Sequence, residues 1–256
     1  MTGCQRSDGG DASTVRHLIY LHGFGSSPES TKARFFAERL RPFGIDVRCP
    51  DLNEPDFSTL TTTRMIAQVE QEMALLPPGP MALVGSSLGG FVAYQIAIRQ
   101  ARARDAGEPV RRPVDRLVLL APALDFGRSG FGPLDTAGLE RWRRTDRYDV
   151  MHYALNQVRP IRFALYEDAQ KYDSFAEPIP IPALIFHGWR DDVVDPAMVQ
   201  RFAAGRHAVS LSMLDDDHLL SANLELIWSE SARFLGVCAG DAAAARTRRK
   251  RFCGLG

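Results

Sequence analysis

Two adjacent serines between glycines are the residues whose types and spacing could most directly do chemistry. The segment GSSLG, residues 85–89, directly follows a short apolar run. Centred on Ser87, it reads G-x-S-x-G, a strand-to-helix turn so sharp that its serine hydroxyl stands exposed as a nucleophile. Centred on Ser86, the same pattern would need glycine at Val84 and Leu88, so Ser87 is the candidate. A Gly/Ser-rich loop is the alternative interpretation, because five residues of this kind also recur by chance.

A serine hydroxyl becomes a strong nucleophile only when a base removes its proton, and histidine is the usual base. Of the six histidines, His218 lies in the segment LDDDHLL, between the last expected strand and the last expected helix. Reactive groups of open α/β sheets gather beyond the carboxyl ends of the strands. His218 is therefore the candidate base, and a loop histidine without a catalytic role is the alternative. The three neighbouring acids, residues 215–217, are expected to solvate the loop.

The base in turn needs a carboxylate that holds its tautomer and stabilises the imidazolium. The segment HGWRDDVVD, residues 187–195, follows the fifth expected strand and places Asp191 at the tip of a loop. Asp192 and Asp125 are alternative partners, and each could instead be a solvated loop acid. The order Ser87, Asp191, His218 is the order that serine hydrolysis on a parallel sheet requires.

A tetrahedral intermediate also needs hydrogen-bond donors for its oxyanion, and removing one donor can cost about 3–4 kcal/mol. The N–H of Leu88 follows the candidate nucleophile at a helix N-terminus, whose dipole favours negative charge. The glycines of LHGFGSSP, residues 21–28, let the loop after the first strand bend over the site. We expect the N–H of Phe24 to be the second donor. A plain glycine turn is the alternative interpretation of this loop.

The elements that must position these residues alternate along the chain. Six short apolar runs predict buried strands at His17–His22, Ile45–Cys49, Met81–Gly85, Arg116–Ala121, Ala183–His187 and Val209–Leu214. Apolar residues at helical spacing predict helices over residues 31–41, near 65–76, from the serine onward, and over 220–235. This alternation predicts an α/β fold with a mostly parallel, doubly wound sheet of about six strands in one domain over residues 16–237.

The interval from Gly127 to Ile181, between the fourth and fifth strands, is too long for a single connecting helix. It opens with glycines, turns helical and aromatic, and closes with a proline-rich run. Insertions this long are usually functional, and aromatic residues argue against disorder, so we predict a helical cap over residues 127–181. The residues expected to line a substrate pocket are His22, Gly23, Trp142, Tyr153, Tyr166 and Trp189. The cap aromatics could instead form the cap's own core.

Composition bounds the function further. With 31 basic and 31 acidic side chains among 256 residues, the chain has no net charge, which argues against a nucleic-acid partner. No apolar run approaches the roughly 20 residues that cross a bilayer.

Residues 1–15 lack the apolar core of a secretory signal and are expected to be a disordered leader. Residues 238–256 are expected to be a flexible basic tail, although their arginine cluster could bind nucleic acid or anionic lipid. Four scattered cysteines predict no disulfide framework or zinc site and favour a cytoplasmic location.

The motifs HGFGSSP, GSSLGG, HGWRDDVVD and DDDH, in this order, resemble those of α/β-hydrolase-fold enzymes over roughly residues 16–236. More narrowly, YLHGFGSSP with Lys32-Ala33, followed by Pro50-Asp51-Leu52, is similar to the small YqiA-like bacterial esterases. This resemblance implies hydrolysis of carboxylic esters and acyl thioesters with no metal or organic cofactor.

The resemblance also implies roles for the candidate residues. It makes Ser87 the nucleophile, Asp191 the acid and His218 the base, with Phe24 and Leu88 as backbone donors. We therefore expect a serine hydrolase that cleaves small carboxylic esters with short- to medium-chain acyl groups through an acyl-enzyme. The alternatives are an acyl thioesterase, another hydrolase on the same fold, or a non-catalytic binding scaffold. The sequence does not indicate an oligomeric state.

Overall fold

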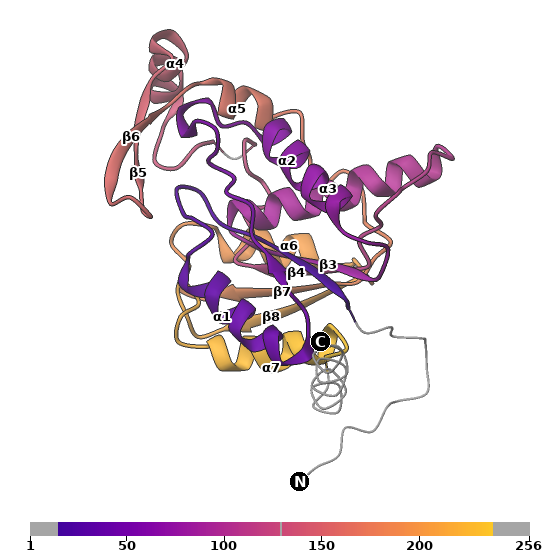
Figure 1. Cartoon of the computed structure of the whole chain (residues 1–256). Helices are drawn as coiled ribbons and strands as arrows, with labels where there is room; N and C mark the ends of the chain where they lie inside the picture. Colours follow the sequence, from indigo (N-terminus) through magenta and orange to yellow (C-terminus); the bar gives the residue numbers. More distant parts are fainter. Residues whose placement is uncertain (1–14, 129, 238–256) are drawn as a thin grey trace, which may run out of the picture.

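The computed structural model describes residues 15–128 and 130–237, so residues 1–14 of the expected leader and all of the expected basic tail lie outside the described part of the chain. Six strands form a central sheet in which every neighbouring pair is parallel (Figure 1). Their bounds are β1 His17–Leu21, β2 Val47–Arg48, β3 Met81–Ser86, β4 Arg116–Leu120, β7 Ala183–Gly188 and β8 Val209–Leu214. Their order is β2-β1-β3-β4-β7-β8. The predicted α/β fold with a mostly parallel sheet is confirmed.

The central strands are buried along almost their whole length, which explains their nearly continuous apolar sequence. Every residue of β3 and β7 is buried, as is every residue of β1 and β4 except the first. A parallel sheet with helices on both faces leaves its strands no water-facing side, so polar residues do not alternate with apolar ones. The edge strand β2 is only two residues long and shorter than the expected strand Ile45–Cys49.

Helices cover both faces of the sheet (Figure 1). On one face lie α1 (Thr31–Leu40) and α7 (Leu224–Phe234), and on the other lie α2 (Thr62–Leu75), α3 (Leu88–Asp105) and α6 (Pro196–Ala203). Two short 3-10 turns, η1 (Arg41–Phe43) and η2 (Phe57–Thr59), precede β2 and α2. Three of these five helices begin at side chains that accept a hydrogen bond from the first turn, namely Ser30, Thr61 and Asp195.

The last helix begins later than the apolar spacing predicts. Leu220 was expected in its first turn, but the helix starts at Leu224, and Leu220 lies in the preceding loop with a positive φ of 54°. The backbone N–H groups of Ala222 and Asn223 donate instead to the carboxylate of Asp216. This carboxylate therefore accepts from two backbone N–H groups that lie where an earlier-starting helix would run, and residues 220–223 form a loop instead.

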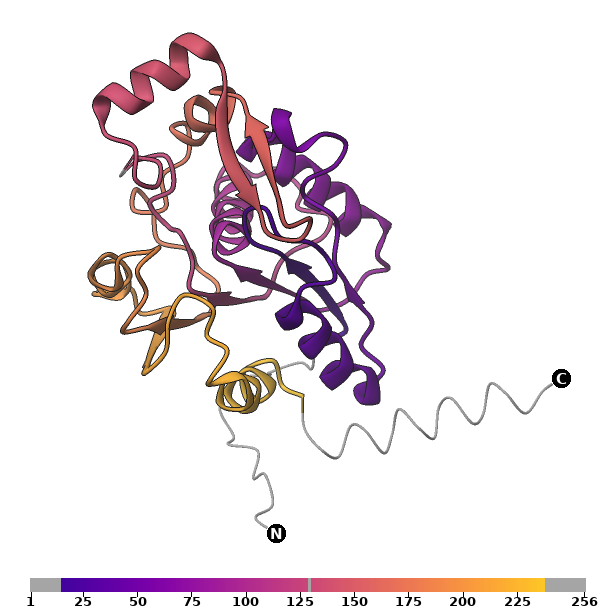
Figure 2. The same ribbon diagram turned by 90° about the vertical axis from the view of Figure 1, so that its left-hand side faces the viewer.

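The insertion between β4 and β7 contains two helices, as expected, and a β-hairpin that was not predicted. Its elements are α4 (Thr136–Thr145), β5 (Tyr148–His152), β6 (Gln157–Ile161) and α5 (Ala164–Ala169), with β5 and β6 antiparallel. Figure 2 shows the hairpin reaching from α4 toward the loop after β1. The apolar residues of this cap belong to the same core as those between the sheet, α2 and α3.

Val15 corrects the expected boundary of the leader. Its side chain is 1% exposed, and its N–H donates to the carbonyl of Leu235 at 3.3 Å. The packed body of the protein therefore includes Val15. Within residues 15–128 and 130–237, no helix combines the length and the apolar character needed to span a bilayer.

The start of α3 lies so close to β1 that one position tolerates only glycine, and this gives a stability test. A Cβ on Gly89 would overlap the carbonyl oxygen of Leu21, which is backbone and cannot move aside. We expect Gly89→Ala to lower the free energy of unfolding by at least about 3 kcal/mol, because overpacking against backbone forces the elements apart.

Urea unfolding measures the loss of stability in Gly89→Ala, and Gly107→Ala is the matched control. Gly107 has a positive φ of 73° and nothing within 4 Å of its added Cβ, so only the strain of about 1 kcal/mol should appear. Equal losses in the two variants would contradict the close approach of α3 to β1.

Candidate active site

Ser87 occupies a strained turn between β3 and α3. Its backbone has φ 53° and ψ −117°, a region that non-glycine residues rarely adopt. Its N–H donates to the carbonyl of Leu120 at 2.8 Å, and its own carbonyl accepts from the N–H groups of Gly90 and Ala123 at 2.9 and 3.2 Å. These bonds to β4 and α3 hold the turn in its strained form. The sharp turn predicted from the G-x-S-x-G pattern is therefore present at this serine.

Ser87, His218 and Asp191 form one hydrogen-bonded chain across three loops. The Nε2 atom of His218 lies 3.0 Å from the Oγ of Ser87, and its Nδ1 lies 2.8 Å from the Oδ2 of Asp191. A carboxylate can only accept, so the Nδ1 of His218 carries the proton and Nε2 is free to accept the serine proton. The structure thus brings together the three side chains that the sequence analysis selected.

The carboxylate of Asp191 is fully buried at the end of this chain. Its Oδ1 accepts from the N–H groups of Val193 and Val194 at 2.9 and 2.8 Å. Burial would raise the pKa of Asp191, but the hydrogen bonds from His218 and these two amides outweigh it and lower the pKa below its ordinary value. Asp191 is therefore ionised at neutral pH and can stabilise an imidazolium. Asp192 is exposed, and among the described residues neither it nor Asp125 contacts His218.

The loop that carries His218 is held by groups that the sequence analysis did not identify. Asp216 is 4% exposed, and its carboxylate accepts from the N–H groups of Asp217, Ala222 and Asn223. The expectation that all three acids solvate the loop is therefore wrong for Asp216, which shapes the loop. The carbonyls of Asp216 and Asp217 also lie where a Cβ on Gly188 would be, so this loop packs tightly against the end of β7.

The loop after β1 passes directly beside Ser87, as expected for a loop that carries an oxyanion donor. A Cβ on Gly23 would lie 3.4 Å from the Cβ of Ser87. The N–H groups of Phe24 and Leu88 have no hydrogen-bond partner within the described ranges. Two free amides near one serine can bind an oxyanion.

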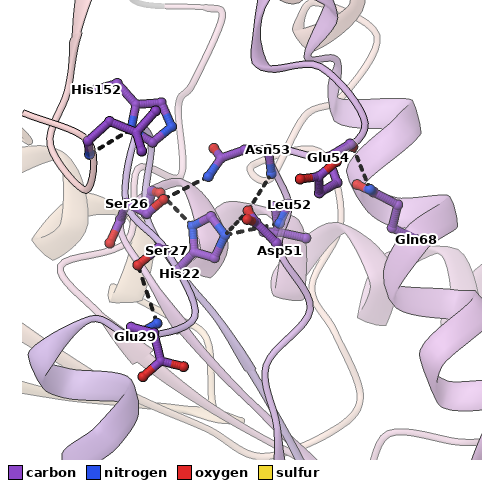
Figure 3. A network of polar contacts seen from close by, with 12 residues as sticks. His22, Ser26, Ser27, Glu29, Asp51, Leu52, Asn53, Glu54, Gln68 and His152 are labelled. Atoms are coloured by element: carbon purple, nitrogen blue, oxygen red, sulfur yellow. Dashed lines mark hydrogen bonds and ion pairs between the residues drawn. The ribbon is translucent and has the colours of Figure 1, made fainter. Parts of the chain in front are cut away.

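Polar contacts from the segment that follows β2 hold this loop in place (Figure 3). His22 is 2% exposed; its Nδ1 donates to the carbonyl of Gly23 at 2.9 Å, and its Nε2 accepts from the N–H of Leu52 at 3.0 Å. The amide of Asn53 donates to the carbonyl of Ser26 at 2.7 Å. His22 was expected to line a pocket, but it lies beneath the loop and anchors it. The resemblance to the YqiA-like esterases included the segment PDL, residues 50–52, but assigned no role to it. In the structure, the N–H of Leu52 anchors the loop after β1 through His22.

The cap hairpin supplies a third anchor for the same loop. The N–H of Ala154, in the turn of the hairpin, donates to the carbonyl of Gly25 at 3.0 Å. The ring of Phe24 packs against Phe57 and Phe131 with centroids 5.3 and 6.0 Å apart. The position of the expected donor therefore depends on the cap as well as on β1.

The aromatic residues predicted for a pocket fall into two groups. Trp142 is 1% exposed, its Nε1 donates to the carbonyl of Ile161, and its ring packs on Phe163 and Tyr166. Trp142 was predicted to line a pocket, but its side chain forms the core of the cap. Tyr166 packs against it. Tyr153 and Trp189 are instead 72% and 54% exposed.

A cavity of about 450 Å³ lies beside the loop after β1, between the segment that follows β2 and the cap hairpin. Its polar lining includes Ser27, Asp51, Asn53, Asp56, His152 and Arg159. Ser87 and His218 do not line it. The cavity therefore borders the loop after β1 at Ser27.

A serine on a strained turn after β3, an acid loop after β7 and a histidine loop after β8 of a parallel sheet define the α/β-hydrolase fold. The chain belongs to the uncharacterised protein family UPF0227, whose model matches residues 17–229.

Comparisons with individual proteins agree with this class. The chain is 25% identical over 184 residues to the mitochondrial palmitoyl-protein thioesterase ABHD10 of Bos taurus, and the match covers 69% of this chain and 57% of that protein. It is similar in fold to Est1E from Butyrivibrio proteoclasticus, solved with ferulic acid, with a TM-score of 0.69, 21% identity and coverage of 87% and 88% of the two chains. For mouse alpha/beta hydrolase domain-containing protein 10, the TM-score is 0.67, the identity 20% and the coverage 87% and 90%.

Lys32 ties α1 to the His218 loop, and its ionisation gives a testable pH dependence. Its Nζ donates to the carbonyl of Leu219 at 2.8 Å. Burial lowers the pKa of Lys32 from 10.5 to about 8, against the opposing charges of Asp217, Asp191 and Asp216. Between these two pH values the unfolded chain binds more protons than the folded one, so deprotonation favours the folded state.

We expect the wild type to gain stability relative to Lys32→Met as the pH rises from about 8 toward 10.5. Thermal unfolding of both proteins at pH 7, 9 and 10 measures this difference. Arg34→Met, which removes a charge from an exposed position of the same helix, is the control and should show no such trend. Parallel stability curves for the wild type and Lys32→Met would contradict the lowered pKa.

Proposed function

We propose that the protein is a serine hydrolase that cleaves carboxylic esters of short- to medium-chain acyl groups through an acyl-enzyme. The observation that carries the proposal is the unbroken chain from the Oγ of Ser87 through His218 to the buried carboxylate of Asp191. The two free amides beside the serine support it. In this proposal the protein needs neither a metal nor an organic cofactor and acts on a small-molecule ester.

In the first half of the reaction, Ser87 attacks the ester carbonyl while the Nε2 of His218 takes its proton. The ionised Asp191 stabilises the imidazolium that forms. The N–H groups of Leu88 and Phe24 donate to the oxyanion of the tetrahedral intermediate. His218 then gives the proton to the departing alcohol, which leaves an acyl ester on Ser87.

In the second half, water attacks the acyl ester, with His218 again acting as the base. The second tetrahedral intermediate uses the same two amides. The proton returns through His218 to the Oγ of Ser87, and the carboxylic acid leaves. The first and the last of these proton transfers use the 3.0 Å contact between His218 and Ser87.

Acyl thioesters are the second candidate substrates, favoured by the 25% identity to a palmitoyl-protein thioesterase. The chain spans 57% of that protein's length, so its activity comes to this chain only as a proposal. A thiolate is a better leaving group than an alkoxide, because thiols are far more acidic than alcohols. The proposed machinery would therefore act on a thioester without further groups.

A non-catalytic scaffold is disfavoured by the cost of the serine turn. A non-glycine residue in such a backbone region costs about 1–3 kcal/mol, and the buried Asp191 needs several donors to remain charged. A binding scaffold requires neither feature. The cytoplasmic location expected from the cysteines remains part of this proposal, whereas the name of the relative from Bos taurus is that of a mitochondrial protein.

The direct test of this function is hydrolysis of p-nitrophenyl esters from acetate to palmitate, together with matching acyl thioesters. We expect Ser87→Ala to lower kcat/KM by at least about 10³-fold on every substrate that the wild type cleaves, because no other group supplies the nucleophile. The preferred chain length would measure the acyl site. Full activity in the folded Ser87→Ala protein would overturn the mechanism.

The anchoring of the oxyanion loop gives a second test. Asn53→Asp removes the donor to the carbonyl of Ser26 and faces that oxygen with a negative charge. We expect kcat to fall about tenfold with KM changed less than about twofold, because the oxyanion donors act in the transition state.

Gln68→Ala is the control for Asn53→Asp. The amide of Gln68 donates to the carbonyl of Glu54 at 2.7 Å in the same network (Figure 3), but it does not reach the loop after β1. Its kcat should stay near that of the wild type. Equal losses of kcat in the two variants would contradict a specific role of the Asn53 contact in holding the oxyanion loop.

A further inference from the structure

A second buried histidine contacts the carboxylate of Asp191. His187 ends the apolar part of β7 with 0% of its surface exposed. Its Nε2 lies 3.3 Å from the Oδ2 of Asp191 and 3.0 Å from the carbonyl of Val194. Its Nδ1 is buried and has no hydrogen-bond partner within residues 15–128 and 130–237. The reaction steps described above do not use this residue.

These contacts determine the tautomer of His187. A proton on Nε2 has the carbonyl of Val194 as its acceptor, whereas a proton on Nδ1 would be a buried donor without an acceptor. The doubly protonated ring would have the same unsatisfied donor, and burial lowers the pKa of His187 despite the nearby charges of Asp191 and Asp195. His187 is therefore a neutral ring that donates through Nε2.

The carboxylate of Asp191 has three hydrogen-bond donors and a fourth polar group beside it. Its Oδ1 accepts from two backbone amides, and its Oδ2 accepts from His218 at 2.8 Å. The Nε2 of His187 lies 3.3 Å from the same Oδ2. These four groups surround both oxygens and favour one orientation of the carboxylate.

We propose that His187 is a positioning residue that acts on His218 through Asp191, which rests on the function proposed above. The partial positive charge of its Nε2–H, with Nε2 3.3 Å from the Oδ2 of Asp191, holds that oxygen toward the Nδ1 of His218. It also takes up part of the negative charge that Asp191 presents to His218. The chain that activates Ser87 thus has four side chains rather than three.

Removing this donor has a defined consequence. Without it, the Oδ2 of Asp191 presents more negative charge to His218 and stabilises the imidazolium more strongly. The other charged groups near Asp191 and the His218 loop include Lys32, Arg190, Asp195 and the acids of residues 215–217, and they stay unchanged. The acid limb of the kcat/KM–pH profile should therefore move to higher pH, and activity at neutral pH should fall.

The test compares three substitutions in the full chain. His187→Gln keeps an amide N–H at the place of Nε2, His187→Asn is too short to reach Asp191, and His187→Met is apolar. We expect His187→Gln to retain kcat/KM within about threefold. We expect the other two to lose about tenfold and to move the acid limb up by about half a pH unit. The exposed His207 provides the control His207→Met, which should change neither.

Proton NMR supplies a readout that does not depend on activity. The proton between His218 and Asp191 should give a low-field signal in the wild type and in His187→Gln. It should shift in His187→Asn and in His187→Met. If His187→Met does not fold, judged by circular dichroism, the comparison of Asn with Gln decides. An unmoved acid limb and an unmoved signal in His187→Asn would overturn the proposal, even if that variant is less active.

A failure of the proposed hydrolase function would give different experimental results from a failure of the role proposed for His187. If the wild type cleaves no ester or thioester and a fluorophosphonate does not label Ser87, the proposed hydrolase activity is wrong. The low-field signal still tests the contact from His187 through Asp191 in that case. A signal that shifts in His187→Asn and persists in His187→Gln would support the positioning role alone.

Discussion

The backbone strain at Ser87 is the constraint on which the rest of the site depends. A serine at φ 53° is unfavourable in isolation, and it persists because β4 and the first turn of α3 satisfy its N–H and carbonyl groups. The same turn requires α3 to start against β1, where Gly89 leaves room for the carbonyl of Leu21. The sheet core therefore stabilises the exposed serine, and the chemistry at the surface depends on packing beneath it.

The other parts of the site converge on this turn because the sheet is parallel. The loops after β1, β3, β7 and β8 all leave the same edge, so Ser87 and His218, which lie 131 positions apart in sequence, can form a hydrogen bond there. Each loop is fixed by its own polar contacts: Asn53 and the cap hold the loop after β1, the buried Asp216 shapes the loop of His218, and three hydrogen-bond donors orient Asp191. The site is thus preorganised by hydrogen bonds that the substrate does not touch.

Local patterns were enough to predict the six strands and the three side chains of the hydrogen-bonded chain, because turn chemistry and strand order are short-range or topological features. The supporting contacts were not predictable in this way. Asp216 looked like its two acidic neighbours, and only the loop geometry separates it from them. The hairpin Tyr148–Ile161 lacks a clear alternation of apolar and polar residues, and one of its faces packs on the cap core. Trp142 was assigned to a pocket because composition cannot distinguish an aromatic lining from an aromatic core.

The most direct measurement of the central claim is mass spectrometry of the protein quenched during turnover of p-nitrophenyl butyrate. If Ser87 is the nucleophile, the intact protein gains the mass of one butyryl group, and peptide mapping places it on Ser87. Turnover without an adduct, or a butyryl group on another residue that forms and decays at the turnover rate, would contradict the acyl-enzyme mechanism.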